Sequence, residues 1–445
     1  MRQTRLIMLL LGALALPSIL SAAYAAEIQP APECTVRGGL PNVAKKLAGG
    51  TKVTIAYLGG SITAQSGYRV QTLEWFRSQF PKATVDHVDA GIGGTGSDLG
   101  AFRVGRDVIA HKPDLVFIEF AVNDSGREPQ SILESMEGLV RQIRRADPET
   151  DICFVYTVMH GHGKLMLDDL ALGRYPRAAA TMELLADHYA IPSIHMGVKL
   201  QQLVQAGTVI FQKALPKAER LKAMAEGLFY FSGDGVHPYE DTGHVLYTQA
   251  VVRSMGLILP AGSAATPALP PPLTADNWED AKTIPFGEAA QLTGWRVLGQ
   301  DETLAKQFVN RMPKIWTGEQ PGARAVIRFK GSHLKLFDLE GPACGRLRVT
   351  VDGKDLGYVN RFTKYAHSGY RLTNIDIASG LDPQAVHTIV LEIPEDGPDK
   401  RAILKGLDEE PNRKALALDD AAFAKRFEGN KAYIGMVCLR GELVQ

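Results

Sequence analysis

Between residues 52 and 259 the chain alternates short apolar runs with amphipathic stretches of helical length. The apolar runs are rich in Val, Ile and Phe and predict strands at Val53–Leu58, Thr84–Val88, Leu115–Phe120, Ile152–Val158 and Ile191–His195. The amphipathic stretches predict helices at Arg69–Phe80, Gly100–His111, Ser131–Ala146, Ala178–Tyr189 and Tyr239–Met255. Because parallel strands need long crossover connections, which are usually helices, this order predicts a parallel, flavodoxin-like sheet in a three-layer α/β/α sandwich.

The alternation stops at a proline-rich segment, Pro260–Pro272, which holds three consecutive prolines. Proline has no amide donor and resists helix, so this segment is predicted to be an extended connector. Strand patterns without intervening helices follow it at Arg324–Phe329, Leu334–Asp338, Leu347–Val351, Arg371–Ile375 and His387–Ile393. A hairpin turn is indicated at Asp352-Gly353. We expect a β-sandwich or jelly-roll-like domain with one helical insertion around Arg413–Phe427.

The first residues have the pattern of a cleaved secretory signal. Arg2 and Arg5 precede the apolar run Leu6–Leu16, and Ala23-Tyr24-Ala25 offers a small-residue cleavage site. The apolar run is too short for a membrane span, so no stable membrane insertion is expected after cleavage. The mature protein is expected to be secreted or periplasmic. The predicted parts are a signal peptide at residues 1–25, an α/β domain at 26–259, a linker at 260–274 and a β domain at 275–445.

Charge and cysteine content exclude several classes of protein. The 49 Lys and Arg residues balance 49 Asp and Glu residues, so the basic excess typical of nucleic-acid binders is missing and no nucleic-acid partner is expected. Four cysteines are too few for a disulfide scaffold, and no Cys/His spacing suggests a metal site. A disulfide between Cys344 and Cys438 stays open, whereas Cys153 is expected to be a buried free thiol.

Short polar motifs follow the first three predicted strands. Gly59-Gly60 end the first strand and Ser61 then opens a helix, a suitable place for a nucleophile, although such a serine is more often an N-cap. After the second strand, the amide of Gly94 belongs to a glycine-rich loop that could hold an oxyanion. After the third strand, Asn123 could donate its side-chain amide into the same crevice, and asparagine is also ordinary turn chemistry there.

The glycine-rich loop also has a nucleotide-binding interpretation. Gly91, Gly93 and Gly96 match the GxGxxG spacing of dinucleotide-binding loops. That motif follows the first strand of its sheet and needs an acidic ribose-binding residue further along, and neither condition is met here. The nucleotide interpretation is therefore weak.

A fourth motif lies just before the last helix. Asp234 precedes His237 by three residues, so its carboxylate can hold one ring nitrogen and leave the other free to take a proton from a serine. His160 and His162 follow the fourth strand and are tentative substrate-binding residues, the metal-ligand interpretation being weaker. Arg69 and Arg103, on helices near the site, are expected to be solvated.

In this order the four motifs resemble the four blocks of the SGNH hydrolase superfamily, the GDSL-like esterases and lipases. The resemblance implies that Ser61 is the nucleophile, with Asp234 and His237 as its acid–base pair. It further implies an oxyanion hole formed by the amides of Ser61 and Gly94 and by the side chain of Asn123. An acyl-serine intermediate follows from it, and neither a metal nor an organic cofactor is required.

The resemblance covers roughly residues 50–257 and has three departures. Gly60, Asp89 and Ala121 stand where the family usually has Asp, Asn and Gly. None of these positions supplies a group to the proposed reaction. The departures therefore bear on which subfamily the chain resembles more than on the predicted activity.

Exported members of this superfamily with an attached β-sandwich often act on O-acetylated polysaccharides. The resemblance therefore implies a serine esterase that removes ester, mainly O-acetyl, groups from a carbohydrate. The substrate is then a small-molecule or polysaccharide ester. A lipid-ester or thioester hydrolase is the alternative, and a glycan-binding protein with a non-catalytic hydrolase fold is another. Trp278, Trp295 and Trp316 could stack on sugars or belong to the core.

Overall fold

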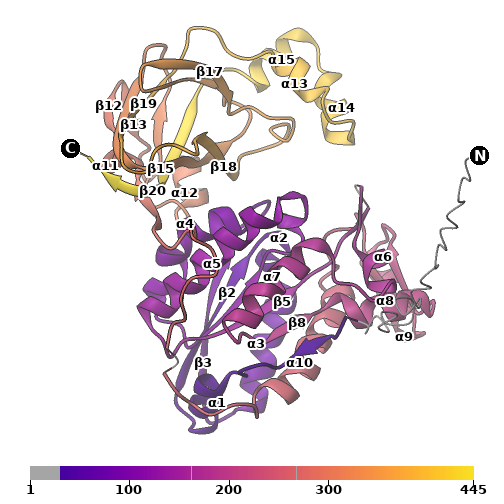
Figure 1. Ribbon diagram of the computed structural model, residues 1–445. Coiled ribbons are helices and arrows are strands. Elements are labelled where there is room, and N and C mark those ends of the chain that lie inside the picture. The colour runs from indigo at the N-terminus through magenta and orange to yellow at the C-terminus, as the bar shows by residue number, and fades with distance from the viewer. Residues whose placement is uncertain (1–30, 162, 267, 445) are drawn as a thin grey trace, which may run out of the picture.

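The computed structural model describes residues 31–161, 163–266 and 268–444, and the predicted signal peptide lies outside them. Within these ranges no helix has the length and apolar character needed to cross a membrane. Figure 1 shows two regions, an α/β domain in the first half of the chain and a β-rich domain in the second. The exact division of the chain at residues 259 and 275 stays a prediction.

A six-stranded sheet forms the centre of the α/β domain, in the order β1–β8–β5–β4–β2–β3. These strands are β1 (Cys34–Thr35), β2 (Lys52–Gly59), β3 (Thr84–Gly91), β4 (Leu115–Glu119), β5 (Asp151–Tyr156) and β8 (Ser193–His195). All neighbours from β3 to β8 pair in parallel, and β1 adds an antiparallel edge. The parallel part has the flavodoxin-like order, which confirms the predicted sheet.

Helices cover both faces of this sheet (Figure 1). The helices of the domain are α1 (Pro41–Ala48), α2 (Ser61–Ala64), α3 (Tyr68–Gln79), α4 (Ser97–Asp107), α5 (Pro129–Ala146), α6 (Met166–Ala171), α7 (Arg177–His188), α8 (Gly197–Gln205), α9 (Lys217–Ala225) and α10 (Gly243–Ile258). Successive residues of β2 enter different cores: Leu58 packs on the side of α4 and α5, and Tyr57 on the side of α3 and α10. The three layers predicted from the sequence are therefore confirmed.

Two small elements beside the main sheet were not predicted. The parallel strands β9 (Val209–Gln212) and β10 (Phe229–Ser232) form a separate pair. The strands β6 (His160–Gly161) and β7 (Lys164–Leu165) form a short antiparallel ribbon. Strand β10 matters for function because it ends two residues before Asp234.

The second region is built on an antiparallel ten-stranded sheet, as expected for the β domain. Its strands are β11 (Ala281–Pro285), β12 (Gln291–Thr293), β13 (Trp295–Val297), β14 (Trp316–Gly318), β15 (Arg324–Glu340), β16 (Arg346–Val351), β17 (Lys354–Asn360), β18 (Arg371–Ala378), β19 (Val386–Glu392) and β20 (Ala432–Leu443). Its helices are α11 (Phe286–Ala289), α12 (Thr303–Phe308), α13 (Lys400–Leu404), α14 (Glu410–Leu416) and α15 (Asp420–Arg426). The helical insertion predicted around Arg413–Phe427 corresponds to the two short helices α14 and α15, and α13 before them was not predicted.

Local predictions in the β domain have mixed outcomes. Asp352 and Gly353 have φ angles of 51° and 79° between β16 and β17, which confirms the hairpin turn. The two strands predicted at residues 324–329 and 334–338 are wrong as separate elements, because both belong to β15. This long strand changes partner from β19 to β18, and its register with β20 shifts after Gly331. A bulge lets one strand bend and serve two parts of the sheet.

The structure decides whether Cys344 and Cys438 form a disulfide and whether Trp278 and Trp316 lie in the core. Cys344 and Cys438 are both buried free thiols, so the disulfide considered between them is not formed, and Cys153 is a buried free thiol as predicted. Trp278 and Trp316 are 7% and 8% exposed, so they belong to the core and are not sugar platforms. Trp278 packs against Phe102 of α4 at a ring distance of 5.5 Å, which joins it to the α/β domain.

Replacing Trp278 by Ala should lower the free energy of unfolding by about 3–5 kcal/mol, because a large buried ring is lost from the core. Urea unfolding followed by intrinsic fluorescence or circular dichroism measures this change. An unchanged unfolding midpoint together with weaker glycan binding would contradict the core assignment.

Candidate active site

Two glycines shape the turn between β2 and Ser61. A Cβ on Gly59 would lie 2.2 Å from Thr63 Oγ1, and a Cβ on Gly60 would lie 1.9 Å from Asn123 Oδ1. Neither position has room for a side chain. The Asn123 side chain therefore occupies the space that a side chain at position 60 would need in this chain. Ser61 then starts α2 just after the carboxyl end of β2, which lies between β4 and β3 in the sheet.

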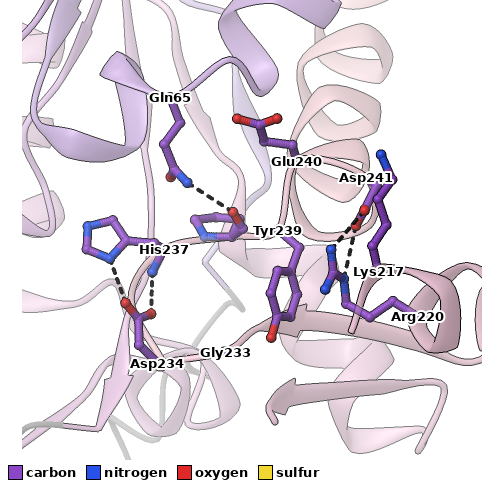
Figure 2. A pocket seen from close by; sticks show the side chains of 10 residues that line it. Gln65, Lys217, Arg220, Gly233, Asp234, His237, Tyr239, Glu240 and Asp241 are labelled. Atoms are coloured by element: carbon purple, nitrogen blue, oxygen red, sulfur yellow. Dashed lines mark hydrogen bonds and ion pairs between the residues drawn. The ribbon is translucent and has the colours of Figure 1, made fainter. Parts of the chain in front are cut away.

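Ser61, His237 and Asp234 form a continuous chain of hydrogen bonds. His237 Nε2 lies 2.9 Å from Ser61 Oγ, and His237 Nδ1 lies 2.7 Å from Asp234 Oδ2. Figure 2 shows Asp234 and His237 facing each other across one short loop. The structure thus brings Ser61 to the Asp234–His237 pair, which lies more than 170 positions further along the chain, in the arrangement that a nucleophilic serine requires.

Asp234 is held as a carboxylate by its own loop. Its Oδ1 accepts hydrogen bonds from the Val236 and His237 amides, both at 2.8 Å, and from Ser232 Oγ at 2.9 Å. Burial acts to raise the pKa of Asp234, but the bonds from His237 and the loop outweigh it and hold that pKa well below its ordinary value. An ionised Asp234 keeps the proton on His237 Nδ1 and leaves Nε2 to accept from Ser61.

The predicted oxyanion donors lie beside the serine. A Cβ on Gly93 would be 3.7 Å from Ser61 Cβ, so the loop after β3 passes directly over the nucleophile. The next residue, Gly94, has a φ of +72°, a conformation that favours glycine. Asn123 approaches from the other side, against Gly60, at the start of the short helix η2 (Asn123–Gly126). The structure therefore places the residue before Gly94 next to Ser61, and Asn123 next to Gly60.

A buried carboxylate supports the loop that carries Gly94. Asp124 accepts from the Ser97 amide at 3.1 Å, at the first turn of α4, and forms an ion pair with Arg127 at 3.4 Å. Burial raises the pKa of Asp124 to about 6, although the Arg127 charge and the bonds from Ser97 oppose this shift. Asp124, the residue after the predicted oxyanion donor Asn123, thus anchors α4, the helix that follows the loop of Gly94.

The arginines near the site are buried, and their prediction as solvated residues is wrong. Arg103 is fully buried and donates to the carbonyls of Ala90 at 2.6 Å and Gly59 at 3.1 Å. Arg69 is 5% exposed and donates to the Thr63 carbonyl at 3.0 Å. The physical reason is that each guanidinium has an anionic partner, Asp107 at 3.0 Å for Arg103 and Asp89 at 3.3 Å for Arg69, in addition to these carbonyls.

Glu119 is a buried acid that sequence reasoning missed. It is the last residue of β4 and accepts from Thr157 Oγ1 at 2.5 Å and from Thr63 Oγ1 at 3.2 Å. Burial raises its pKa to about 7, opposed by hydrogen bonds from these threonines and the Gly60 amide. Glu119 thus lies directly beneath the nucleophile turn. The available signal was an acidic residue inside the otherwise apolar run 115–120.

The histidines outside the triad have different positions. The His160 amide donates to the Gly235 carbonyl at 2.9 Å, and its ring packs on Phe211 at 5.9 Å, so it adjoins the loop of Asp234. His162 lies outside the described residues. His244 is buried, and its Nδ1 accepts from the Tyr68 amide at 3.0 Å. Burial and the nearby His237 lower its pKa to about 3, so it is a neutral structural residue.

A polar cavity of about 450 Å³ adjoins His237 (Figure 2). It is lined by Gln65, Lys217, Arg220, Gly233, Asp234, His237, Pro238, Tyr239, Glu240 and Asp241. Arg220 is held by Asp241 at 2.8 Å and lies 3.7 Å from the centre of the Tyr239 ring. Such walls offer donors and acceptors to a hydroxyl-rich molecule.

Among the residues that the structure describes, no group of three or more His, Cys, Asp or Glu side chains is arranged to hold a metal ion.

Residues 57–241 match the model of the GDSL-like Lipase/Acylhydrolase family. The α/β domain belongs to this family. The GDSL-like domain is accordingly a carboxylic ester hydrolase domain, as the sequence motifs predicted. A comparison with curated proteins finds no match.

Two solved structures share both regions of the chain. Both are described as a two-domain esterase (CEX) active on acetylated mannans, and one is co-crystallized with mannopentaose. Each is 21% identical, and they cover 93% and 92% of this chain and 98% and 97% of their own, with TM-scores of 0.67 and 0.66. At this identity the likeness establishes the two-domain fold.

Substituting Ala for Gly60 should lower kcat for a small ester by about 10²–10³-fold, the usual effect of losing one oxyanion donor. The reason is that the new Cβ would displace Asn123. Steady-state hydrolysis of 4-nitrophenyl acetate measures the change. Gly105→Ala is a matched control, since that exposed glycine of α4 has open space around its Cβ position. Equal activity of the two variants would contradict the steric argument.

Glu119→Gln should change how stability depends on pH. The pKa of Glu119 is about 7 in the folded protein against an ordinary value of 4.5, so folding favours its protonated form. The stabilisation from protonated Glu119 is fully present below its pKa in the unfolded chain, 4.5. It is lost as the pH rises through its pKa in the folded protein, about 7. Between pH 5 and pH 8 the natural protein should lose about 2–3 kcal/mol that the variant keeps.

Urea unfolding at both pH values measures this difference for Glu119. The exposed Glu288→Gln is the control, and it should follow the natural protein. Parallel pH dependence in the Glu119→Gln variant and the natural protein would refute the prediction.

Proposed function

We propose that this protein is a serine esterase that removes O-acetyl groups from a carbohydrate. The observation that carries the proposal is the hydrogen-bonded chain Ser61–His237–Asp234 next to a polar cavity. The fold shared with an esterase active on acetylated mannans supports the same class of substrate. We also propose that the protein is exported, because its first 25 residues have the pattern of a cleaved signal.

The first half of the proposed reaction forms an acyl-serine. His237 Nε2 takes the proton of Ser61 Oγ as this oxygen attacks the ester carbonyl. The negative charge on the carbonyl oxygen is stabilised by the amides of Ser61 and Gly94 and by the side-chain amide of Asn123. When the tetrahedral intermediate collapses, the bond to the sugar oxygen breaks and His237 returns its proton to that oxygen. The deacetylated sugar leaves.

The second half releases the acid. A water molecule gives a proton to His237 Nε2 and attacks the acyl carbonyl, and the same donors stabilise the oxyanion again. Collapse of this second intermediate breaks the bond to Ser61 Oγ, which recovers its proton from His237. Throughout both halves Asp234 remains a carboxylate and stabilises the charged ring.

The geometry weighs against the two alternatives. A lipid-ester hydrolase needs an apolar channel for the acyl chain, whereas the cavity beside His237 is lined by Lys217, Arg220 and Glu240 among other polar residues. A glycan-binding protein with an inactive hydrolase fold would have no need for the aligned bonds of Ser61, His237 and Asp234. Both alternatives therefore fit the site less well than a carbohydrate O-acetylesterase.

Ser61→Ala should reduce acetate release by at least about 10³-fold, because the nucleophile is lost while the fold is kept. The assay incubates the protein with acetylated mannan, acetylated xylan and 4-nitrophenyl acetate and measures the acid released. An unchanged thermal unfolding midpoint of the variant serves as the control for folding. Most of the activity remaining in this variant would refute the proposed mechanism.

The choice of ester distinguishes the proposed function from its alternatives. Release of acetate from a glycan, with little turnover of long-chain nitrophenyl esters, is the expected result. A preference for long acyl chains would favour a lipid-ester hydrolase instead. Glycan binding without hydrolysis of any ester would favour the non-catalytic alternative.

A further inference from the structure

An arginine of the β domain reaches the predicted oxyanion loop of the α/β domain. Arg371 is the first residue of β18, and its Nη2 lies 3.9 Å from the position that a Cβ on Gly94 would occupy. Gly94 and the neighbouring Gly93 are exposed, and Gly93 adjoins Ser61. A substrate whose carbonyl oxygen points at the Gly94 amide would therefore lie next to Arg371.

The position of Arg371 is fixed within the β domain. It lies opposite Glu340 in the β15–β18 ladder, and its Nε forms an ion pair with this buried carboxylate. Its guanidinium carbon lies 4.6 Å from the centre of the Tyr365 ring. The Arg371 side chain is nevertheless 49% exposed, so part of its guanidinium remains available to a ligand.

The β domain is fixed against the same loop of the α/β domain. Arg311 donates to the carbonyls of Asp89 at 2.7 Å and Gly91 at 3.0 Å, just before the glycine-rich loop. Lys335 of β15 forms a buried ion pair with Asp98, just after that loop. Apolar residues of both domains also share one core. Since contacts hold the loop on both sides, the approach of Arg371 to Gly94 is part of the folded architecture.

We propose that Arg371 and Tyr365 form a subsite for the sugar ring that carries the ester, and this inference rests on the proposed function. A guanidinium presents planar donors that suit neighbouring hydroxyls. The Tyr365 ring is 40% exposed and offers a surface on which a sugar can pack. Arg371 remains paired with Glu340, and its other guanidinium donors suit a hydroxyl-bearing pyranose.

The test compares two substrates in Arg371→Ala and Tyr365→Ala variants of the full chain. The measured quantity is the ratio of kcat/KM for acetylated manno-oligosaccharides to kcat/KM for 4-nitrophenyl acetate, which lacks a sugar. This ratio should fall by at least about tenfold in Arg371→Ala, the effect of losing a hydrogen bond to a charged group. The loss should lie mainly in KM for the oligosaccharide.

Arg348→Ala is the matched control. The Arg348 side chain is 50% exposed and pairs with Asp355 at 2.8 Å, as Arg371 pairs with Glu340. It belongs to the β16–β17 hairpin, and Figure 1 shows β17 at the end of the β domain that faces away from the α/β domain. This variant should leave the substrate ratio unchanged.

Two results would overturn the subsite. An unchanged ratio in Arg371→Ala with activity kept on both esters would show that the sugar does not use this residue. An equal loss on both esters would assign Arg371 to the oxyanion or to folding. A failure of the proposed function would look different from a failure of the subsite. The natural protein would then release no acetate from any glycan, or Ser61→Ala would keep full activity.

Discussion

The site depends on the close approach of two backbones at the carboxyl edge of the sheet. β2 and β4 are parallel neighbours that end together at Gly59 and Glu119. Beyond them the chain can bring Asn123 against Gly60, next to Ser61, because a Cβ at position 60 would lie only 1.9 Å from Asn123 Oδ1. A larger residue at position 60 would separate the nucleophile from its predicted oxyanion donor. The absence of a side chain at position 60 is thus a steric requirement for bringing Ser61 and Asn123 together.

Buried side chains form hydrogen bonds to backbone groups where these strand ends and loops come together. Arg103 bonds the carbonyls of Gly59 and Ala90, while Asp124 bonds the Ser97 amide. Glu119 adds a carboxyl group beneath the turn, with burial holding its pKa near 7. These groups contact no substrate in the proposed reaction. Their role is to hold loops from β2, β3 and β4 in one geometry, which preorganised electrostatic stabilisation requires.

The β domain contributes to the same edge in a different way. Arg311 bonds the strand end before the glycine-rich loop, and Arg371 extends over Gly94 itself. The second domain therefore both supports the oxyanion loop and forms part of the surface around it. Such an arrangement explains physically how an appended β domain can influence which alcohol the esterase accepts, without supplying any residue of the triad.

The sequence by itself determined the parallel α/β sheet, the antiparallel β domain and the identity of the candidate triad, because these follow from local periodicity and short motifs. Ser61, Asp234 and His237 could be chosen since each stands at a recognisable turn after a strand or before a helix. Only the tertiary structure decided that Arg103 is buried, that Trp278 belongs to the core and that Arg371 meets Gly94. Burial and contacts between residues hundreds of positions apart depend on how layers and domains pack, and sequence periodicity carries no record of that packing.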